Sequence, residues 1–239
     1  MDKHKIVVFT GAGISASSGI NTFRDDEDAF WVKYDPKMFA TSEAITERPE
    51  DVYEFHNVLR RLCVDKTPTK THLSIKDMEE LADVTIVTQN IDNLHEKAGS
   101  TNILHLHGEI MKSRDIDGNI FDLTGDLKVG DKSPNGLNLR PHTVLFGEYP
   151  YNIDDSIKAI QEADVILIIG TSFNISYTSL MIRYAKDDAY VININPEGNL
   201  NWLNLIQTKT YNFKADDCIN NVYNEIKTYL DGKRKVQVN

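Results

Sequence analysis

A glycine-rich turn directly follows a short apolar segment near the start of the sequence. The segment 5–10, KIVVFT, leads into GAGISASSG, in which Gly11, Gly13 and Ala16 have the spacing G-x-G-x-x-A. Glycines at this spacing let the backbone approach a pyrophosphate, and the N-terminus of a following helix adds partial positive charge. The pattern therefore predicts that the turn, Ala12 included, binds a dinucleotide.

The residues after this turn differ from those of a dehydrogenase. An enzyme that transfers hydride carries, within about 30 residues, a second strand ending in an acid that binds the ribose. Asp25, Asp26 and Asp28 lie at a tolerable distance, but SASSGINTFR contains no apolar run able to form that strand. The sequence therefore predicts dinucleotide binding without the ordinary architecture of hydride transfer.

Polar residues also follow a second apolar segment, 84–88. The sequence VTQNID ends this expected strand with Gln89, Asn90 and Asp92, and ligands of open α/β sheets bind at the carboxyl ends of the strands. These side chains could reach a ribose or a carboxamide. The alternative is a turn in which Asn and Asp side chains bond to nearby backbone groups.

Two histidines are separated by one residue in LHLHGE. On a strand, His105 and His107 would share one face, because side chains alternate along a strand. With His142 and Glu148 they could bind a metal and support a metal-dependent hydrolase, although no third ligand lies at a recognised spacing. His107, followed by glycine at a strand end, is also well placed for acid–base catalysis.

Composition argues against several classes of protein. The 239 residues carry a net charge of −10, which speaks against direct nucleic-acid binding because that needs clustered Lys and Arg. Two isolated cysteines, Cys63 and Cys218, cannot form a disulfide framework or a four-thiolate metal site. Neither a signal peptide nor a run of about 20 apolar residues is found. We therefore expect a cytoplasmic protein with no membrane contact, and the oligomeric state stays open.

Short apolar segments alternate with amphipathic ones along the chain. We expect strands over residues 5–10, 84–88, 103–106, 165–169 and 190–194. We expect amphipathic helices over residues 49–62, 154–163 and 216–230, and a frayed tail from residue 232. Strands that alternate with helices predict an α/β fold, here a Rossmann-like parallel sheet with helices on both faces.

Two stretches interrupt this alternation. Residues 27–70 show loop and helix patterns, and residues 111–143 are polar and rich in Gly, Asp and Asn, which is typical of short strands and turns. We predict that they form a smaller module, one insertion helical and the other ribbon-like. Residues 1–26, 71–110 and 144–239 would then form the dinucleotide-binding domain.

Five motifs occur in a characteristic order between residues 10 and 172. They are GAGISASSGINTFR, TQNIDNLHEKAG, LHLHGE, LRPHTVLFGEYP and GTS. This order resembles the sirtuins, the Sir2 family of NAD-dependent protein lysine deacylases. The resemblance implies NAD as co-substrate, an acyl-lysine peptide or protein as substrate, and nicotinamide and O-acyl-ADP-ribose as products.

The resemblance also implies roles for individual residues. His107 would be the general base that activates a ribose hydroxyl, with Asn90 and Asp92 acting around the nicotinamide and its ribose. The acyl-lysine would meet Phe23, His107, Val144, Phe146 and Gly147. Contacts with NAD are implied for Gly11, Ala12, Gly13, Ala16, Phe23, Arg24, Gln89, Asn90, Ile91, Asp92, Gly170, Thr171, Ser172, Asn195 and Asp217.

Other outcomes of the same chemistry stay open. ADP-ribosyl transfer and plain NAD hydrolysis also begin with loss of nicotinamide and differ only in the acceptor. A non-catalytic NAD sensor is a further alternative, against which the retention of His107, Asn90 and Asp92 argues.

The interval between HGE and RPH lacks the cysteines with which most sirtuins bind structural zinc. Asp115 stands where the first cysteine pair would begin, and GDKSPNG replaces the second pair. Structural zinc needs four thiolate or imidazole ligands. We therefore predict a zinc-free module held by turns and by Ile120, Phe121, Leu123 and Leu127; one zinc ion per purified chain would contradict this.

One short stretch predicts the acyl preference. Sirtuins that favour acidic acyl groups resemble one another in a Tyr and, three residues later, an Arg that binds the acyl carboxylate. Aligned on Phe55, this chain has His56 and Leu59 there, although a shift of one residue would bring in Arg60 or Arg61. Neither His nor Leu makes the bidentate contact of Arg, so we expect a higher kcat/KM for an acetyl-lysine peptide than for the succinyl-lysine peptide. Faster succinyl turnover would overturn this expectation.

Overall fold

Two β-sheets organise the protein in its computed structural model, which describes residues 3–20, 36–171, 176–197 and 208–237. The strands of the larger, parallel sheet are β1 (Lys5–Thr10), β2 (Asp83–Thr88), β3 (Ile103–His105), β7 (Val165–Ile169), β8 (Tyr190–Ile194) and β9 (Thr208–Tyr211). Their order is β3-β2-β1-β7-β8-β9, with every pair parallel. This is the Rossmann order, in which successive strands are added in one direction from β1 to β3 and in the opposite direction from β7 to β9. The predicted fold class is confirmed.

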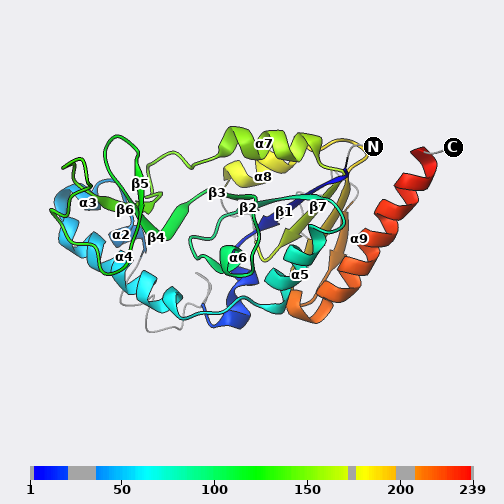
Figure 1. The fold of residues 1–239 in the computed structure, drawn as a ribbon, viewed down its shortest axis with the longest axis horizontal. Coiled ribbons are helices and arrows are strands. Elements are labelled where there is room, and N and C mark those ends of the chain that lie inside the picture. The colour runs from blue at the N-terminus through cyan, green and yellow to red at the C-terminus, as the bar shows by residue number, and fades with distance from the viewer. Residues whose placement is uncertain (1–2, 21–35, 172–175, 198–207, 238–239) are drawn as a thin grey trace.

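Helices cover both faces of this sheet. Helices α5 (Lys70–Met78) and α9 (Ala215–Gln237) pack on one face, and α7 (Ile153–Glu162) and α8 (Ser176–Ile182) on the other (Figure 1). Ile6 and Val8 of β1 join the first layer, whereas Val7 and Phe9 join the second, as the alternation of side chains along a strand requires. Because both faces are buried, the central strands are apolar throughout.

The element boundaries follow the sequence patterns closely, apart from local differences. Strand β9 and helices α5 and α8 were not predicted, since TKTY is short and polar and the helices carry weak apolar periodicity. Strand β3 ends at His105, one residue before the predicted end. The frayed tail is wrong, because α9 continues to Gln237; Lys, Arg and Gln are good helix formers.

The smaller sheet is antiparallel and has the order β5-β4-β6. Its strands are β4 (Gly108–Arg114), β5 (Ile120–Asp122) and β6 (Arg140–Thr143). Beside it lie α2 (Pro36–Phe39), α3 (Ala44–Glu47) and α4 (Pro49–Val64), at the end of the molecule away from α9 (Figure 1). The two sheets occupy the stretches expected for a large domain and a small module, and the exact domain limits stay a prediction.

A small apolar cluster fills the space between this sheet and α4. Leu127 is buried there beside Tyr53, and Phe121 and Leu123 pack against them in part. Ile120, which the sequence placed in this cluster, is 49% exposed. That expectation is wrong because Phe121 faces inward, so its neighbour on the same short strand faces outward.

Asp115 organises the turn between β4 and β5. One carboxylate oxygen accepts hydrogen bonds from the backbone N–H groups of Asp117 at 3.1 Å and Asn119 at 3.0 Å. The Asn119 amide donates to both carboxylate oxygens, and the Ser133 hydroxyl donates from a second turn. A carboxylate thus joins two turns at the position where the resemblance would have begun a cysteine pair.

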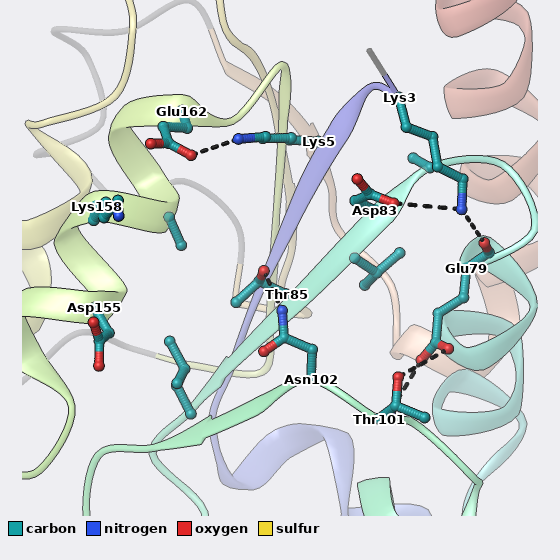
Figure 2. Close-up of a pocket in the computed structure, with 14 residues that line it drawn as sticks. Lys3, Lys5, Glu79, Asp83, Thr85, Thr101, Asn102, Asp155, Lys158 and Glu162 are labelled. Carbon is teal, nitrogen blue, oxygen red and sulfur yellow. Dashed lines mark hydrogen bonds and ion pairs between the residues drawn. The ribbon is translucent and has the colours of Figure 1, made fainter.

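A surface cavity of about 640 Å³ opens at the amino ends of β1 and β2 (Figure 2). Among its charged side chains, Lys3 pairs with Asp83 and Lys5 with Glu162. Ligands of open α/β sheets bind at the opposite, carboxyl edge. Among the described helices, none is both long and apolar enough to cross a membrane.

Gly170 closes the sheet against the glycine turn, and its replacement tests that packing. Its φ is +62°, and a Cβ there would lie 2.6 Å from the backbone N of Ile14. We expect Gly170→Ala to lower the free energy of unfolding by about 2–4 kcal/mol, through left-handed strain and a clash with backbone. Urea denaturation measures this against Gly125→Ala, whose Cβ would meet nothing within 4 Å. Equal losses in the two variants would contradict the packing described.

Candidate active site

The glycine turn lies against β7 at the carboxyl edge of the larger sheet. The backbone N–H of Gly11 donates to the carbonyl of Ile169 at 3.0 Å, and that of Gly13 donates to Gly170 at 2.9 Å. A Cβ on Gly13 would lie only 2.7 Å from the Cα of Gly170. The predicted glycines are therefore needed for two backbones to touch in the crevice between β1 and β7, where Rossmann folds bind dinucleotides.

The helix expected directly after the turn is replaced by two short 3-10 helices. These are η1 (Ala12–Ile14) and η2 (Ala16–Ser18). Their few residues supply a smaller dipole than an α-helix would. In the described part of this stretch, the N–H groups of Gly11, Gly13 and Ile14 already donate within the chain, so the turn offers a phosphate close approach to glycine backbone rather than the dipole of a long helix.

Three of the predicted cofactor residues contact one another beside this turn. The Thr171 hydroxyl donates to the Gln89 side-chain oxygen at 2.7 Å, and the Asn195 amide donates to the Thr171 carbonyl at 3.4 Å. Asp217 is exposed at the start of α9. Its neighbour Asp216 instead accepts from the backbone and hydroxyl of Thr71 at 2.9 and 2.6 Å. Phe23, Arg24 and Ser172 lie outside the described residues.

Asn90 and Asp92 meet the glycine turn through Ser15. The Asn90 amide donates to the Gly11 carbonyl at 3.3 Å and to the Ser15 hydroxyl at 3.2 Å, and Ser15 donates to Asp92 at 2.9 Å. Asp92 also accepts from the backbone N–H of Leu94 at 3.0 Å. Burial raises the pKa of Asp92 above its usual range, against the effect of these donors. The turn-stabilising alternative is therefore also correct for Asp92, and Ser15 is a contact that sequence reasoning missed.

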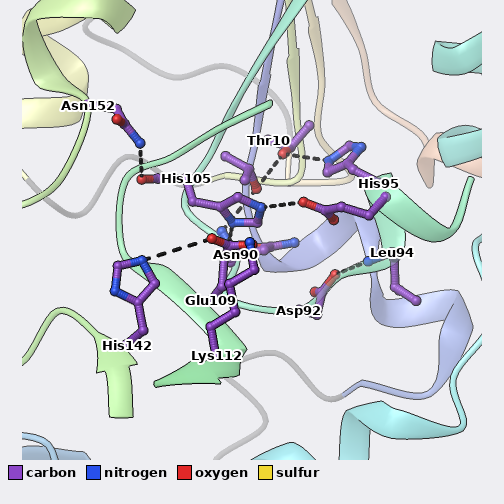
Figure 3. Close-up of polar contacts among 12 residues, drawn as sticks. Thr10, Asn90, Asp92, Leu94, His95, His105, Glu109, Lys112, His142 and Asn152 are labelled. Atoms are coloured by element: carbon purple, nitrogen blue, oxygen red, sulfur yellow. Dashed lines mark hydrogen bonds and ion pairs between the residues drawn. The ribbon is translucent and has the colours of Figure 1, made fainter. Parts of the chain in front are cut away.

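Residues of the LHLHGE segment and the residue after it contact three successive main-chain carbonyls in the loop that follows β2. His107 Nδ1 contacts the Gln89 carbonyl at 2.7 Å. His105 Nδ1 contacts the Asn90 carbonyl at 3.0 Å (Figure 3). The backbone N–H of Ile110 donates to the next carbonyl, that of Ile91, at 2.8 Å. Because a carbonyl only accepts, the proton of each histidine contact lies on Nδ1.

The Nε2 nitrogen of His107 is therefore unprotonated and can act as a base. Burial lowers the pKa of His107 below its ordinary value, and the contact with Gln89 offsets this in part. His107 is thus neutral at pH 7, the form that can accept a proton. The hydroxyl of Tyr177 on α8 lies 2.5 Å from Nε2, and burial raises the pKa of this phenol to about 12, so it donates. No sequence signal pointed to Tyr177.

The residues considered for a metal-dependent hydrolase do not converge. His105 Nε2 contacts Glu96 at 2.7 Å, whereas His107 Nε2 contacts Tyr177. Glu148 pairs with Arg140 at 2.6 Å, and His142 lies 3.9 Å from Glu109. A four-ligand set of His105, His107, His142 and Glu148 is therefore not formed, and that alternative is wrong.

The predicted substrate residues Val144, Phe146 and Gly147 lie directly after the end of β6. Strand β6 ends at Thr143, and Phe146 instead pairs through its N–H and carbonyl with the backbone of residues 40–42. Gly147 turns the chain with φ +95°. The Phe146 side chain is 57% exposed beside it. The backbone N–H and carbonyl of Phe146 are therefore engaged within the chain and are not open to an added strand.

A family model described as the Sir2 family matches residues 11–176, most of the chain. The chain belongs to the Sir2 family. A protein named NAD-dependent protein deacylase from Aggregatibacter actinomycetemcomitans is 41% identical over 196 residues, 81% of this chain and 93% of that protein. A protein of the same name from Bacteroides thetaiotaomicron is 40% identical over 200 residues, 80% of this chain and 85% of that protein.

Solved structures of Sir2 homologues have the same fold. A Sir2 homolog in complex with NAD has a TM-score of 0.81 at 29% identity, covering 95% of this chain and 91% of that one. A mutant Sir2 homologue in complex with ADP ribose has a TM-score of 0.79 at 30% identity, covering 99% and 96%. The predicted sirtuin resemblance is confirmed.

In this Sir2 chain the arginines beside the predicted acyl site bind another partner. Arg60 Nη2 lies 2.5 Å from Asp126, and Arg61 pairs with the same carboxylate and with Glu54. His56 is buried, which lowers its pKa to about 4, and its Nε2 contacts the Thr143 hydroxyl at 2.8 Å. These contacts leave His56 neutral and engage both arginines, in line with the expected preference for uncharged acyl groups.

Replacing Tyr177 by Phe tests the state of the base in this Sir2 enzyme. A donor to Nε2 stabilises neutral His107, so its removal favours the imidazolium and moves the acid limb of kcat/KM to higher pH. We expect kcat/KM at pH 6 to fall by roughly 2- to 10-fold relative to wild type, the equivalent of one hydrogen bond, with convergence at pH 8. The exposed Tyr184, changed to Phe, is the matched control. An acid limb that stays in place would rule out this contact.

Proposed function

We propose that the protein is an NAD-dependent protein lysine deacylase that releases nicotinamide and O-acyl-ADP-ribose. The observation that carries this proposal is the placement of His107, whose Nδ1 lies 2.7 Å from the Gln89 carbonyl. It lies on the loop system of Asn90 and Asp92 at the carboxyl edge of the Rossmann sheet. The two relatives that share about 40% of their residues carry the name NAD-dependent protein deacylase, which supports the same activity.

In this proposal, some residues of the chain bind NAD and others take part in the reaction. The glycine turn and Gly170 offer backbone to the pyrophosphate, and Gln89, Thr171 and Asn195 meet a ribose. NAD supplies an anomeric carbon from which nicotinamide leaves when the acyl oxygen attacks. Asn90 and Asp92 then hold the ribose, and His107 Nε2 takes the proton of the ribose hydroxyl that attacks the acyl carbon.

The substrate side of the site is formed by the residues that follow β6. Val144, the exposed Phe146 and Gly147 border the approach to His107, because the Val144 N–H donates to the His107 carbonyl at 2.9 Å. We expect them to contact an acyl-lysine peptide. Three further proposals rest on the sequence: the domain limits, a cytoplasmic location and the absence of structural zinc. The turn formed by Asp115 supports the absence of zinc.

Incubation with NAD and an acetyl-lysine peptide, followed by mass spectrometry, tests the function. We expect one O-acetyl-ADP-ribose and one nicotinamide for each lysine deacetylated. His107→Ala should lose at least about 100-fold in kcat, because general-base catalysis contributes about 10²–10⁴-fold. ADP-ribose formed without peptide would indicate an NAD hydrolase, and an ADP-ribosylated peptide would indicate a transferase. Binding of NAD without turnover would indicate a sensor.

A further inference from the structure

His105 lies between the two ends of the loop that carries the proposed catalytic residues. Its Nδ1 contacts the Asn90 carbonyl at 3.0 Å (Figure 3). Its Nε2 contacts the Glu96 carboxylate at 2.7 Å. Glu96 is on α6 (Leu94–Lys97), which begins where the loop ends. One imidazole therefore spans residues 90–96. Its side chain is only 7% exposed.

The two partners of His105 fix its protonation. A main-chain carbonyl and a carboxylate both accept hydrogen bonds and donate none. A neutral imidazole has a single N–H, so it can donate to only one of these oxygens. Its other ring nitrogen, which is then an acceptor, would face the second acceptor oxygen. Only the imidazolium donates to both, and charge-assisted contacts of this length are strong.

The charges around His105 also favour the imidazolium. Burial disfavours its charge, but the contact with Glu96 and the nearby Glu109 on β4 outweigh this and raise the pKa of His105. The same pair lowers the pKa of Glu96, against the effect of burial. Of the other titratable neighbours, Lys112 pairs with Glu109, His95 and His142 are held neutral by burial, and Asp92 lies across the loop.

We propose that His105, as a buried imidazolium bridging Asn90 and Glu96, is a positioning residue that holds the Asn90–Asp92 loop in its catalytic geometry. The Asn90 side chain leaves this loop toward Gly11 and Ser15, and Ser15 carries the contact on to Asp92. A shift of the Asn90 backbone would therefore move both groups. The inference rests on the function proposed above for this loop.

A metal ion is the rival occupant of the same cluster. Ligand atoms of Glu96, His105 and Glu109 lie close enough together to share one cation. However, Lys112 Nζ already lies 2.7 Å from Glu109, and His105 Nε2 contacts Glu96 directly with no room for an ion between them. A proton on His105 supplies the positive charge that a metal would otherwise bring.

Nitrogen-15 NMR of the full chain, free of NAD and peptide, tests the charge directly. We expect both ring nitrogens of His105 to be protonated at pH 7, with deprotonation only above its ordinary range. The signal is identified by its loss in His105→Gln. A neutral ring at pH 7 would overturn the proposal, as would one equivalent of bound metal that Glu96→Gln removes. This readout does not depend on deacylase activity, so its failure is distinct from failure of the proposed function.

Kinetics of NAD-dependent deacetylation test the positioning role. We expect His105→Ala to lower kcat by roughly 10- to 100-fold, the loss typical of a misplaced catalytic group, with a smaller change in the peptide KM. Glu96→Gln should retain most of the activity, since an amide donor lets neutral His105 keep both contacts, whereas Glu96→Ala should lose more. Glu79→Gln, which alters a carboxylate paired with Lys76 at the opposite edge of the sheet, is the matched control.

The pH profile separates positioning from general stability. A histidine with a raised pKa contributes its contact at low pH and loses it as pH rises through the folded-state pKa. Wild-type kcat should therefore fall on the alkaline side, and this limb should be absent from Glu96→Gln, in which His105 is neutral throughout. Identical alkaline limbs in both proteins, or an equal loss in Glu79→Gln, would overturn the proposal.

Discussion

Three consecutive main-chain carbonyls at the end of β2 need hydrogen-bond donors. The rest of the active site depends on which groups supply these donors. Buried carbonyls left without partners are unfavourable. The carbonyls of Gln89, Asn90 and Ile91 lie beyond the last residue pair of the parallel ladder, so no strand of the larger sheet serves them. His107, His105 and the backbone of Ile110 supply the donors from a single short segment. The proposed base is therefore also part of what holds the loop it works beside.

This arrangement also fixes where the base sits between the two sheets. Strand β4 begins at Gly108, directly after His107. Gly108 has φ +80°, and a Cβ there would lie 2.2 Å from the His142 carbonyl. Only glycine lets the chain pass from the edge of the large sheet into the small one at this point. The small sheet thus orients His107. The contacts that hold this sheet together, such as the hydrogen bonds of Asp115, affect the site indirectly.

Much of this could be read from the sequence because it follows from local patterns. Apolar runs gave the strands of the sheet, and glycine spacing gave the turn against β7. Ser15, Glu96 and Tyr177 were missed because their partners lie 9 to 77 residues away in the chain, and no periodicity encodes such contacts. The inward side chain expected for Ile120 was wrong because an apolar pattern does not show which side chains of a short edge strand face the core.

A structure of the protein with NAD and an acyl-lysine peptide bound tests the central role of His107 most directly. With Nδ1 on the Gln89 carbonyl, Nε2 should lie about 2.6–3.2 Å from a hydroxyl of the nicotinamide ribose, and the Tyr177 hydroxyl should have given up its contact. A His107 whose Nε2 still faces Tyr177, or whose Nδ1 has left Gln89 while both ligands are in place, would contradict the assignment of His107 as the base.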